Sequence, residues 1–179
     1  DIKIRLIKDF SNVNLSLIGD FRAENANAAL TLAQELKINT NKAINTLETF
    51  KGLGRRLEYK GEVQGVKFYD DYAVQPYTIL KTTNALCDEF TKSKITLVLE
   101  PHTFSRVKKF FKEFVEAIMN TKVERVIICN TFPAREFGNS EKVSKKLAES
   151  VGDKSIFTGT IEQTAKYIKA NLKSFDIVC

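Results

Sequence analysis

Apolar positions along the chain follow two periods. After about residue 54, short apolar runs alternate with stretches in which apolar residues recur every three to four positions. The runs indicate strands and the longer period indicates helices. Strands are expected at 56–60, 66–69, 95–99, 125–129, 155–157 and 176–178, and helices at 77–90, 105–120, 141–149 and 160–172. This alternation predicts an α/β fold with a mostly parallel sheet.

Two of these runs, 95–99 and 125–129, are the most continuously apolar. Parallel strands are covered by helices on both faces and are therefore buried on both sides. We expect these two strands inside the sheet, with Cys129 in the core.

The first 53 residues follow another pattern. Alternation predicts strands at 3–7 and 13–18, and two helices follow, the first rich in alanine. The helices are expected at 24–36 and 41–49, the second with Thr40 as its N-cap. The glycine-flanked stretch 51–54 is the expected boundary between domains 1–53 and 54–179. Because the first strands lack a sheet of their own, we interpret the sequence as part of a larger protein; a complete small protein is the alternative.

Composition narrows the choice of partners. The net charge of +6 arises mostly after residue 53, and it suits anionic ligands. No basic stripe is interleaved with aromatic residues, so nucleic acid is not an expected partner. No apolar run approaches the roughly 18 residues of a membrane span, and the N-terminus lacks the pattern of a signal peptide. We therefore expect a cytoplasmic protein without a membrane partner.

Three scattered cysteines and one histidine argue against a disulfide framework and a metal centre.

Doubled charges mark the first candidate site. Arg55 and Arg56 stand at the start of one predicted strand, and Asp70 and Asp71 stand at the end of the next. Arginine offers a planar fork of donors that suits phosphate, and a carboxylate can accept from ribose hydroxyls or help to hold a metal. A cross-strand salt bridge on a solvated edge is the structural alternative.

Two further candidates follow buried strands, where α/β sheets bind ligands. His102 and Arg106 lie between the strand 95–99 and the start of a helix, whose first N–H groups favour anions. The alternatives are a hydrogen-bonded structural imidazole and a solvated arginine. The run 131–136 follows the strand 125–129, and a surface pair of Arg135 and Glu136 is the alternative there.

Together these motifs resemble those of the Mur ligase family. The resemblance includes Phe-x-Gly-x-x-Arg-Arg-x-Glu at 50–58, Asp-Asp-Tyr-Ala-x-x-Pro at 70–76, Pro-His at 101–102 with Ser-Arg at 105–106, and Pro-Ala-Arg-Glu at 133–136. It implies a Rossmann-like C-terminal domain at 54–179, preceded by the tail end of a central ATPase-type domain at 1–53.

The resemblance also implies an activity. It is that of a ligase of peptidoglycan precursor synthesis, which uses ATP to activate a UDP-linked sugar carboxylate for attack by an amino acid, L-alanine in the most similar subgroup. No Gly-x-x-x-x-Gly-Lys-[Ser/Thr] loop is present, so ATP and magnesium would be bound mainly by an upstream domain. The implied nucleotide-binding residues are Asn25, Arg56 and Asp71, and the implied catalytic residues are Tyr72, His102 and Arg106.

Two departures from the family pattern keep the function open. Val74 and Gln75 replace a histidine pair, and Phe21 and Arg22 replace a His-Asn pair. Valine can neither donate a hydrogen bond nor carry charge, so the added amino acid is not determined. A non-catalytic, Rossmann-like module that binds a nucleotide or a partner is the competing hypothesis.

Overall fold

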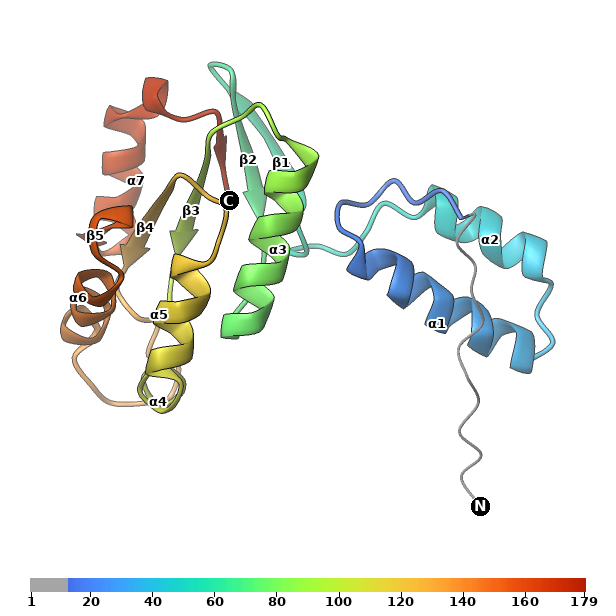
Figure 1. The fold of residues 1–179 in the computed structure, drawn as a ribbon, viewed down its shortest axis with the longest axis horizontal. Helices are drawn as coiled ribbons and strands as arrows, with labels where there is room; N and C mark the ends of the chain where they lie inside the picture. The colour runs from blue at the N-terminus through green and yellow to red at the C-terminus, as the bar shows by residue number, and fades with distance from the viewer. Residues whose placement is uncertain (1–12) are drawn as a thin grey trace. The chain divides into compact units, whose positions relative to one another are not determined.

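The computed structural model describes residues 13–179, and the strand predicted at 3–7 lies outside them. The chain divides into two compact units, Asp1–Leu53 and Gly54–Cys179. Among the described residues, the first unit contains two helices and the second a sheet with helices (Figure 1).

In the first unit, α1 (Phe21–Glu35) packs against α2 (Thr40–Thr49) and buries Ala26 and Leu30. The predicted cap is wrong by one residue. Asn39 is the N-cap of α2, and its Oδ1 accepts a hydrogen bond from the backbone N–H of Lys42 at 3.0 Å. Asparagine is a stronger N-cap than threonine, which agrees with this choice.

The strand predicted at 13–18 is also wrong. These residues form no strand in the described part of the chain. They run beside residues 50–52 instead, because Ser16 donates to the carbonyl oxygen of Phe50 at 3.4 Å and Leu17 packs against Gly52. The alternating apolar side chains belong to a loop segment that bends from residue 17 onward.

The second unit is built on a six-stranded sheet in the order β1-β2-β6-β3-β4-β5. The strands are β1 (Glu58–Val63), β2 (Val66–Asp70), β3 (Ile95–Leu99), β4 (Arg125–Cys129), β5 (Ser155–Gly159) and β6 (Ile177–Val178). Only β1 and β2 pair antiparallel, so the prediction of a mostly parallel sheet is confirmed. β1 begins two residues later than predicted, because the backbones of Arg55 and Leu57 are left-handed, with φ of 57° and 50°.

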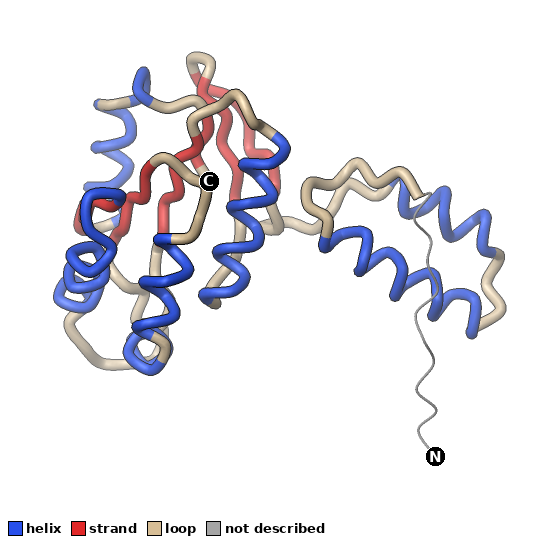
Figure 2. Tube along the Cα trace, in the orientation of Figure 1, coloured by secondary structure: helices blue, strands red, loops and turns tan. Residues whose placement is uncertain are grey.

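Helices cover both faces of the sheet, which Figure 2 shows as red strands between blue helices. They are α3 (Pro76–Glu89), α4 (Phe104–Lys109), α5 (Phe111–Met119), α6 (Ser140–Val151) and α7 (Ile161–Ala170). On one face α5 packs between α3 and α6, while Tyr167 and Ile168 of α7 pack with Ile127 on the other. The helix predicted at 105–120 is two helices, because the chain breaks at Phe110 with φ −114° and ψ 32°. Buried Val107 and Phe114 are seven residues apart, a spacing that an unbroken helix would share.

The core lies on the two strands expected inside the sheet. β3 and β4 are interior strands, and Val126, Ile127 and Ile128 are fully buried. Cys129 is 3% exposed, as predicted, and burial raises the pKa of its thiol to about 12.

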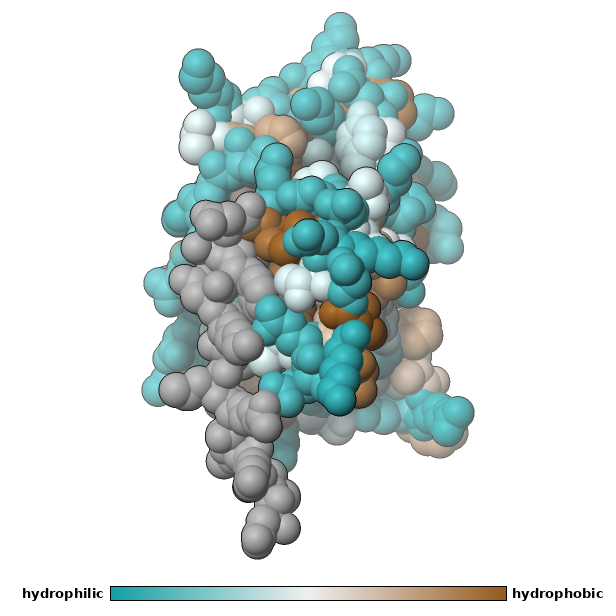
Figure 3. Space-filling model, turned by 90° about the vertical axis from the view of Figure 1, so that its right-hand side faces the viewer, coloured by the Kyte–Doolittle hydropathy of each residue, from teal (hydrophilic) through white to brown (hydrophobic). Residues whose placement is uncertain are grey.

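Some apolar side chains stay at the surface. Figure 3 shows them as brown groups among teal ones on one face of the molecule. In the first unit the exposed large apolar residues are Leu32, Leu36, Ile38, Phe50 and Leu53. A pair of helices encloses too little volume to bury such side chains. No helix among residues 13–179 is long and apolar enough to cross a membrane.

We expect Ile127→Ala to lower the free energy of unfolding by about 2–5 kcal/mol, because the lost methyl groups leave a cavity between the strands and α7. Urea unfolding followed by circular dichroism measures this. Ile161→Ala is the control, since Ile161 is 56% exposed and its loss should cost less than about 0.5 kcal/mol. Equal effects of the two substitutions would contradict the assigned core.

Candidate functional site

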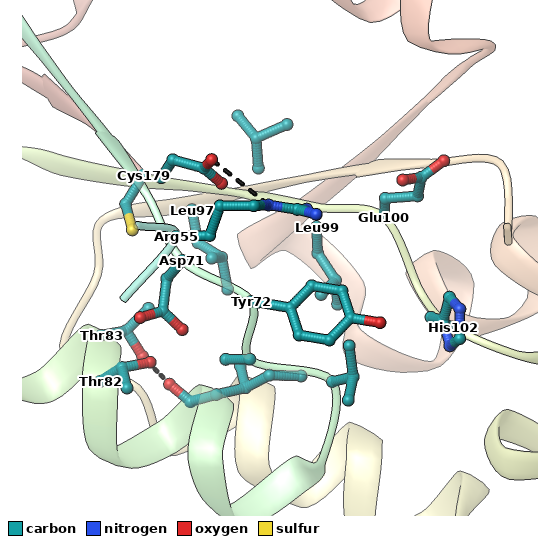
Figure 4. Close-up of a pocket in the computed structure, with 15 residues that line it drawn as sticks. Arg55, Asp71, Tyr72, Thr82, Thr83, Leu97, Leu99, Glu100, His102 and Cys179 are labelled. Atoms are coloured by element: carbon teal, nitrogen blue, oxygen red, sulfur yellow. Dashed lines mark hydrogen bonds and ion pairs between the residues drawn. The ribbon is translucent and has the colours of Figure 1, made fainter. Parts of the chain in front are cut away.

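A cavity of about 200 Å³ opens in the second unit where β2 and β3 end (Figure 4). The carboxyl ends of parallel strands are where α/β sheets bind ligands. Polar groups line one part of it and aliphatic side chains another. Its lining includes Arg55, Asp70, Asp71, Tyr72, Val74, Glu100 and His102.

The first members of the doubled charges form the salt bridge that was the structural alternative. Arg55 Nε lies 3.5 Å from Asp70 Oδ2, and both side chains are more than a third exposed. Such a surface pair stabilises the fold by about 0 to 1 kcal/mol. The turn before β1 is closed by the backbone, since the N–H of Tyr72 donates to the carbonyl of Arg55 at 2.9 Å.

The second members, Arg56 and Asp71, have other contacts. Asp71 Oδ2 accepts from the N–H of Leu57 at 2.8 Å. Arg56 Nη1 donates to the carbonyl of Tyr72 at 3.4 Å, and its guanidinium lies 5.8 Å from the centre of the Tyr72 ring. Each side chain therefore ties the turn before β1 to the loop after β2.

Tyr72 connects the arginine pair to His102. The Arg55 guanidinium lies 4.8 Å from the centre of the Tyr72 ring, and the His102 ring lies edge-on to the same ring at 6.4 Å. Figure 4 shows the Tyr72 ring reaching from beneath Arg55 toward His102. A guanidinium over an aromatic face is held by the ring quadrupole, which fixes the direction of both groups.

His102 and Arg106 are in direct contact. Arg106 Nη1 donates to the carbonyl oxygen of His102 at 2.6 Å and lies 3.2 Å from His102 Nδ1. A guanidinium can only donate, so Nδ1 must be the acceptor and the ring proton of neutral His102 sits on Nε2. The alternative of a solvated Arg106 is wrong, because this side chain is partly buried. The alternative of a hydrogen-bonded imidazole agrees with the contact that His102 makes with Arg106.

The run 131–136, a candidate from the sequence, lies in the loop after β4, but the roles of its residues were not predicted. Phe132 stacks on the His102 ring at 5.3 Å with 11° between the planes, and its N–H donates to the carbonyl of Pro101 at 2.8 Å. The two loops that follow β3 and β4 are thereby joined. The position of Phe132 after a buried strand was a usable signal, because neighbouring strand ends meet at one edge of the sheet.

Glu136 anchors the same loop to the start of α4. Its carboxylate accepts from Thr103 Oγ1 at 2.6 Å, from the N–H of Ser105 at 2.8 Å and from Ser105 Oγ. These hydrogen bonds lower the pKa of Glu136 from 4.5 to about 2. Among the described residues, Glu136 forms no ion pair with Arg135. The alternative interpretation, a surface pair of Arg135 and Glu136, is therefore wrong.

Val74 and Gln75, which replace the histidine pair of the family, have different positions. Val74 is half-buried in the wall of the cavity. Gln75 is the N-cap of α3, where its N–H donates to Thr78 Oγ1 at 3.2 Å and its carbonyl accepts from that hydroxyl at 2.9 Å.

Glu100 lies at the rim of the cavity. Partial burial raises the pKa of its carboxyl group, and the charges of His102 and Arg55 offset part of this shift.

Asn25 is not among the residues that line this cavity. It is exposed on α1 of the first unit, beyond the first turn, and Asp20 occupies the N-cap position of that helix. Among residues 13–179 no three His, Cys, Asp or Glu side chains gather to hold a metal ion.

Comparison with known proteins decides the family. Residues 55–179 match the family described as Mur ligase, glutamate ligase domain. The chain belongs to the Mur ligase family. The UDP-N-acetylmuramate–L-alanine ligase of Clostridium kluyveri is 40% identical over 144 residues, which are 80% of this chain and 31% of that protein. The enzyme of that name from Caldicellulosiruptor bescii is 34% identical over 99% of this chain and 39% of its own length. The chain thus spans between 31% and 39% of these relatives.

Solved structures support the same fold. The UDP-N-acetylmuramate-alanine ligase of Thermotoga maritima matches 92% of this chain and 34% of its own chain, with a TM-score of 0.72 and 21% identity. The folylpolyglutamate synthase of Mycobacterium tuberculosis, described as complexed with ADP and AMPPCP, matches 93% and 38%, with a TM-score of 0.70 and 14% identity. The predictions of the Mur ligase family and of an α/β fold with a mostly parallel sheet are confirmed.

Glu136→Gln tests how much the Glu136 carboxylate contributes to the stability of this Mur ligase domain, because it joins the loop after β4 to the loop that carries His102. The folded-state pKa of Glu136 is about 2 and its ordinary value is 4.5, so its stabilisation is complete above about pH 5 and is lost as the pH falls toward 2. We expect the variant to be less stable than wild type at pH 7 and the difference to shrink continuously below pH 4.5.

Urea unfolding at a series of pH values measures this difference. Glu141→Gln is the control, because Glu141 is an exposed carboxylate in the first turn of α6. A difference between wild type and Glu136→Gln that does not change with pH would contradict the assigned contacts.

Proposed function

We propose that this chain provides the C-terminal part of an ATP-dependent ligase of peptidoglycan precursor synthesis, which joins L-alanine to UDP-N-acetylmuramate. The relatives named for this reaction share up to 40% identity with the chain. The observation that carries the proposal is the continuous contact from Arg56 through Tyr72 and His102 to Arg106 at the carboxyl edge of the sheet. These are the residues that match the motifs of the family.

Arg56 and Asp71 form the nucleotide side of the proposed site. Arg56 is exposed, and its planar donors fit phosphate oxygens beside the Tyr72 ring. The chain has no phosphate-cradling loop, so these two residues and Asn25 fit only part of an ATP site, and the upstream part of the protein would hold the phosphates and magnesium. ATP, when bound, supplies the phosphoryl group that activates the substrate carboxylate. A related fold described as complexed with ADP and AMPPCP supports a nucleotide here.

Arg106 and His102 form the acceptor side. The donors of Arg106 that His102 does not use are suited to the carboxylate end of the sugar substrate, and the guanidinium offsets the negative charge that develops there. The hydrogen bond to His102 Nδ1 directs the remaining donors and leaves the Nε2 proton available. Most of the rate enhancement from this domain would come from such positioning and electrostatic stabilisation.

A second candidate function is a non-catalytic, nucleotide-binding or partner-binding module. Val74 favours it, because an aliphatic side chain lies in the cavity wall where the family has a polar residue. Gln75 supports this candidate less, because its backbone N–H and carbonyl bind Thr78 Oγ1 at the start of α3 and so give the residue a structural role. The two candidates differ in whether Arg106 affects a reaction rate.

Residues 1–179 alone should form no acyl phosphate from ATP and UDP-N-acetylmuramate, because the phosphate-cradling loop is absent from their sequence. Hydroxylamine trapping of the activated carboxylate measures this. The full-length protein, assayed in parallel, is the positive control. Trapped product from the 179-residue chain would disprove the proposal that the upstream part of the protein holds the phosphates of ATP.

Arg106→Ala in the full-length protein should lower kcat/KM by at least about 100-fold, because a charge-assisted contact in the transition state is lost. Lys109→Ala is the matched control, since Lys109 is an exposed cation on the same helix, and its activity should stay within about threefold of wild type. If Arg106→Ala kept kcat/KM within about threefold of wild type, the proposed role of Arg106 would be wrong. A full-length protein inactive with every amino acid would favour the non-catalytic module.

A further inference from the structure

A second hollow, of about 490 Å³, lies between the α4–α5 segment and α6. It shares no lining residue with the cavity at the strand ends. We call it the lysine groove, and its lining residues are Lys108, Phe111, Asn139, Lys142, Val143 and Lys146. Nothing in the proposed ligase reaction uses it.

The polar side chains of the lysine groove present donors. Lys108, Lys142 and Lys146 are exposed, and none forms an ion pair with any residue in the described part of the chain. The side-chain oxygen of Asn139 already accepts from the N–H of Lys142 at 2.8 Å, which leaves its amide hydrogens. An occupant of the groove must therefore bring acceptors and negative charge.

The other lining residues are apolar. Phe111 and Val143 are half-buried, and Lys146 Nζ lies 5.2 Å from the centre of the Phe111 ring. Lysine stems are themselves apolar and extend this surface while their ammonium groups stay in water. Nearby, Phe137 is fully exposed two residues before Asn139. The occupant must therefore carry apolar groups between its charges.

We propose that the lysine groove binds an acidic peptide segment of another protein, one in which carboxylates flank a bulky apolar side chain. A groove between helices with an apolar floor and charged rim is typical of peptide recognition. Charge complementarity favours an acidic partner, and the net charge of +6 disfavours a second copy of this chain.

Two other classes of partner fit the groove less well. Single-stranded nucleic acid needs a series of exposed aromatic faces on which successive bases stack. Phe137 beside the groove is a single exposed ring, and Phe111 in the lining is half-buried beneath Lys146. A lipid surface is flat and would leave the floor of a hollow between two helices unfilled. Both become outcomes of the test.

The test uses residues 1–179 and a short labelled peptide of glutamates around one central phenylalanine, with binding followed by fluorescence anisotropy. The variant Lys142→Glu/Lys146→Glu reverses two charges in the groove. The matched control Lys166→Glu/Lys169→Glu reverses two exposed charges on α7, which packs on the opposite face of the sheet. A peptide with serine in place of phenylalanine tests the apolar floor.

We expect the groove variant to weaken binding at least about tenfold and the control variant less than about threefold, since contact charges matter more than distant screened ones. The serine peptide should also bind more weakly. Amide shifts in the NMR spectrum of the wild-type chain should change around Phe111 and Val143, an outcome that does not depend on the folding of a variant.

Several results would overturn the proposal. Equal weakening by both charge reversals would mean that the peptide responds only to net charge. No binding of the peptide, or shift changes elsewhere in the chain, would exclude the groove as its site. Binding of phosphatidylserine vesicles or of a single-stranded oligonucleotide that depends on Lys142 and Lys146, without binding of the peptide, would assign the groove to those partners instead.

Discussion

The burial of parallel strands on both faces is the constraint from which the rest of this domain follows. β3 and β4 are mostly apolar because helices cover them on both sides, and parallel pairing requires the parallel strands to end at the same edge. The loops that leave this edge cannot be buried with the strands, so polar side chains gather there. The candidate site is thus a consequence of the topology, and the residues after each strand decide its chemistry.

Contacts between loops turn this edge into a rigid surface. Phe132 stacks on His102, Glu136 caps the start of α4, and Arg106 on that helix returns to His102. Each group has its direction fixed by a partner on another loop, which lowers the entropic cost of aligning it with a substrate. A helix of six residues such as α4 has little stability of its own, so the carboxylate of Glu136 compensates for its shortness.

The sequence predicted this arrangement unevenly, for physical reasons. The period of apolar residues identified β3 and β4 to the residue, because a strand buried on both faces leaves no ambiguity. It failed at 13–18, where alternation served packing without pairing, and at Phe110, where the apolar spacing hides a break between helices. The position after a buried strand identified His102 and Arg106 as candidates. Their partners Phe132 and Glu136 come from another loop at the same edge of the sheet. Contacts between loops that are distant in the sequence produce no periodic pattern of residues from which they could be predicted.

The doubled charges show why pattern alone could not separate structure from function. Arg55 and Asp70 form the surface salt bridge, whereas Arg56 and Asp71 bind the backbone of the opposite loop. Surface pairs contribute little stability, so the salt bridge by itself does not require charges at four positions. The backbone hydrogen bond from the Tyr72 N–H to the Arg55 carbonyl holds the turn before β1 against the end of β2, and Arg56 lies at the Tyr72 ring. The backbone thus positions Arg56 and Asp71, the pair that the family motif assigns to the nucleotide.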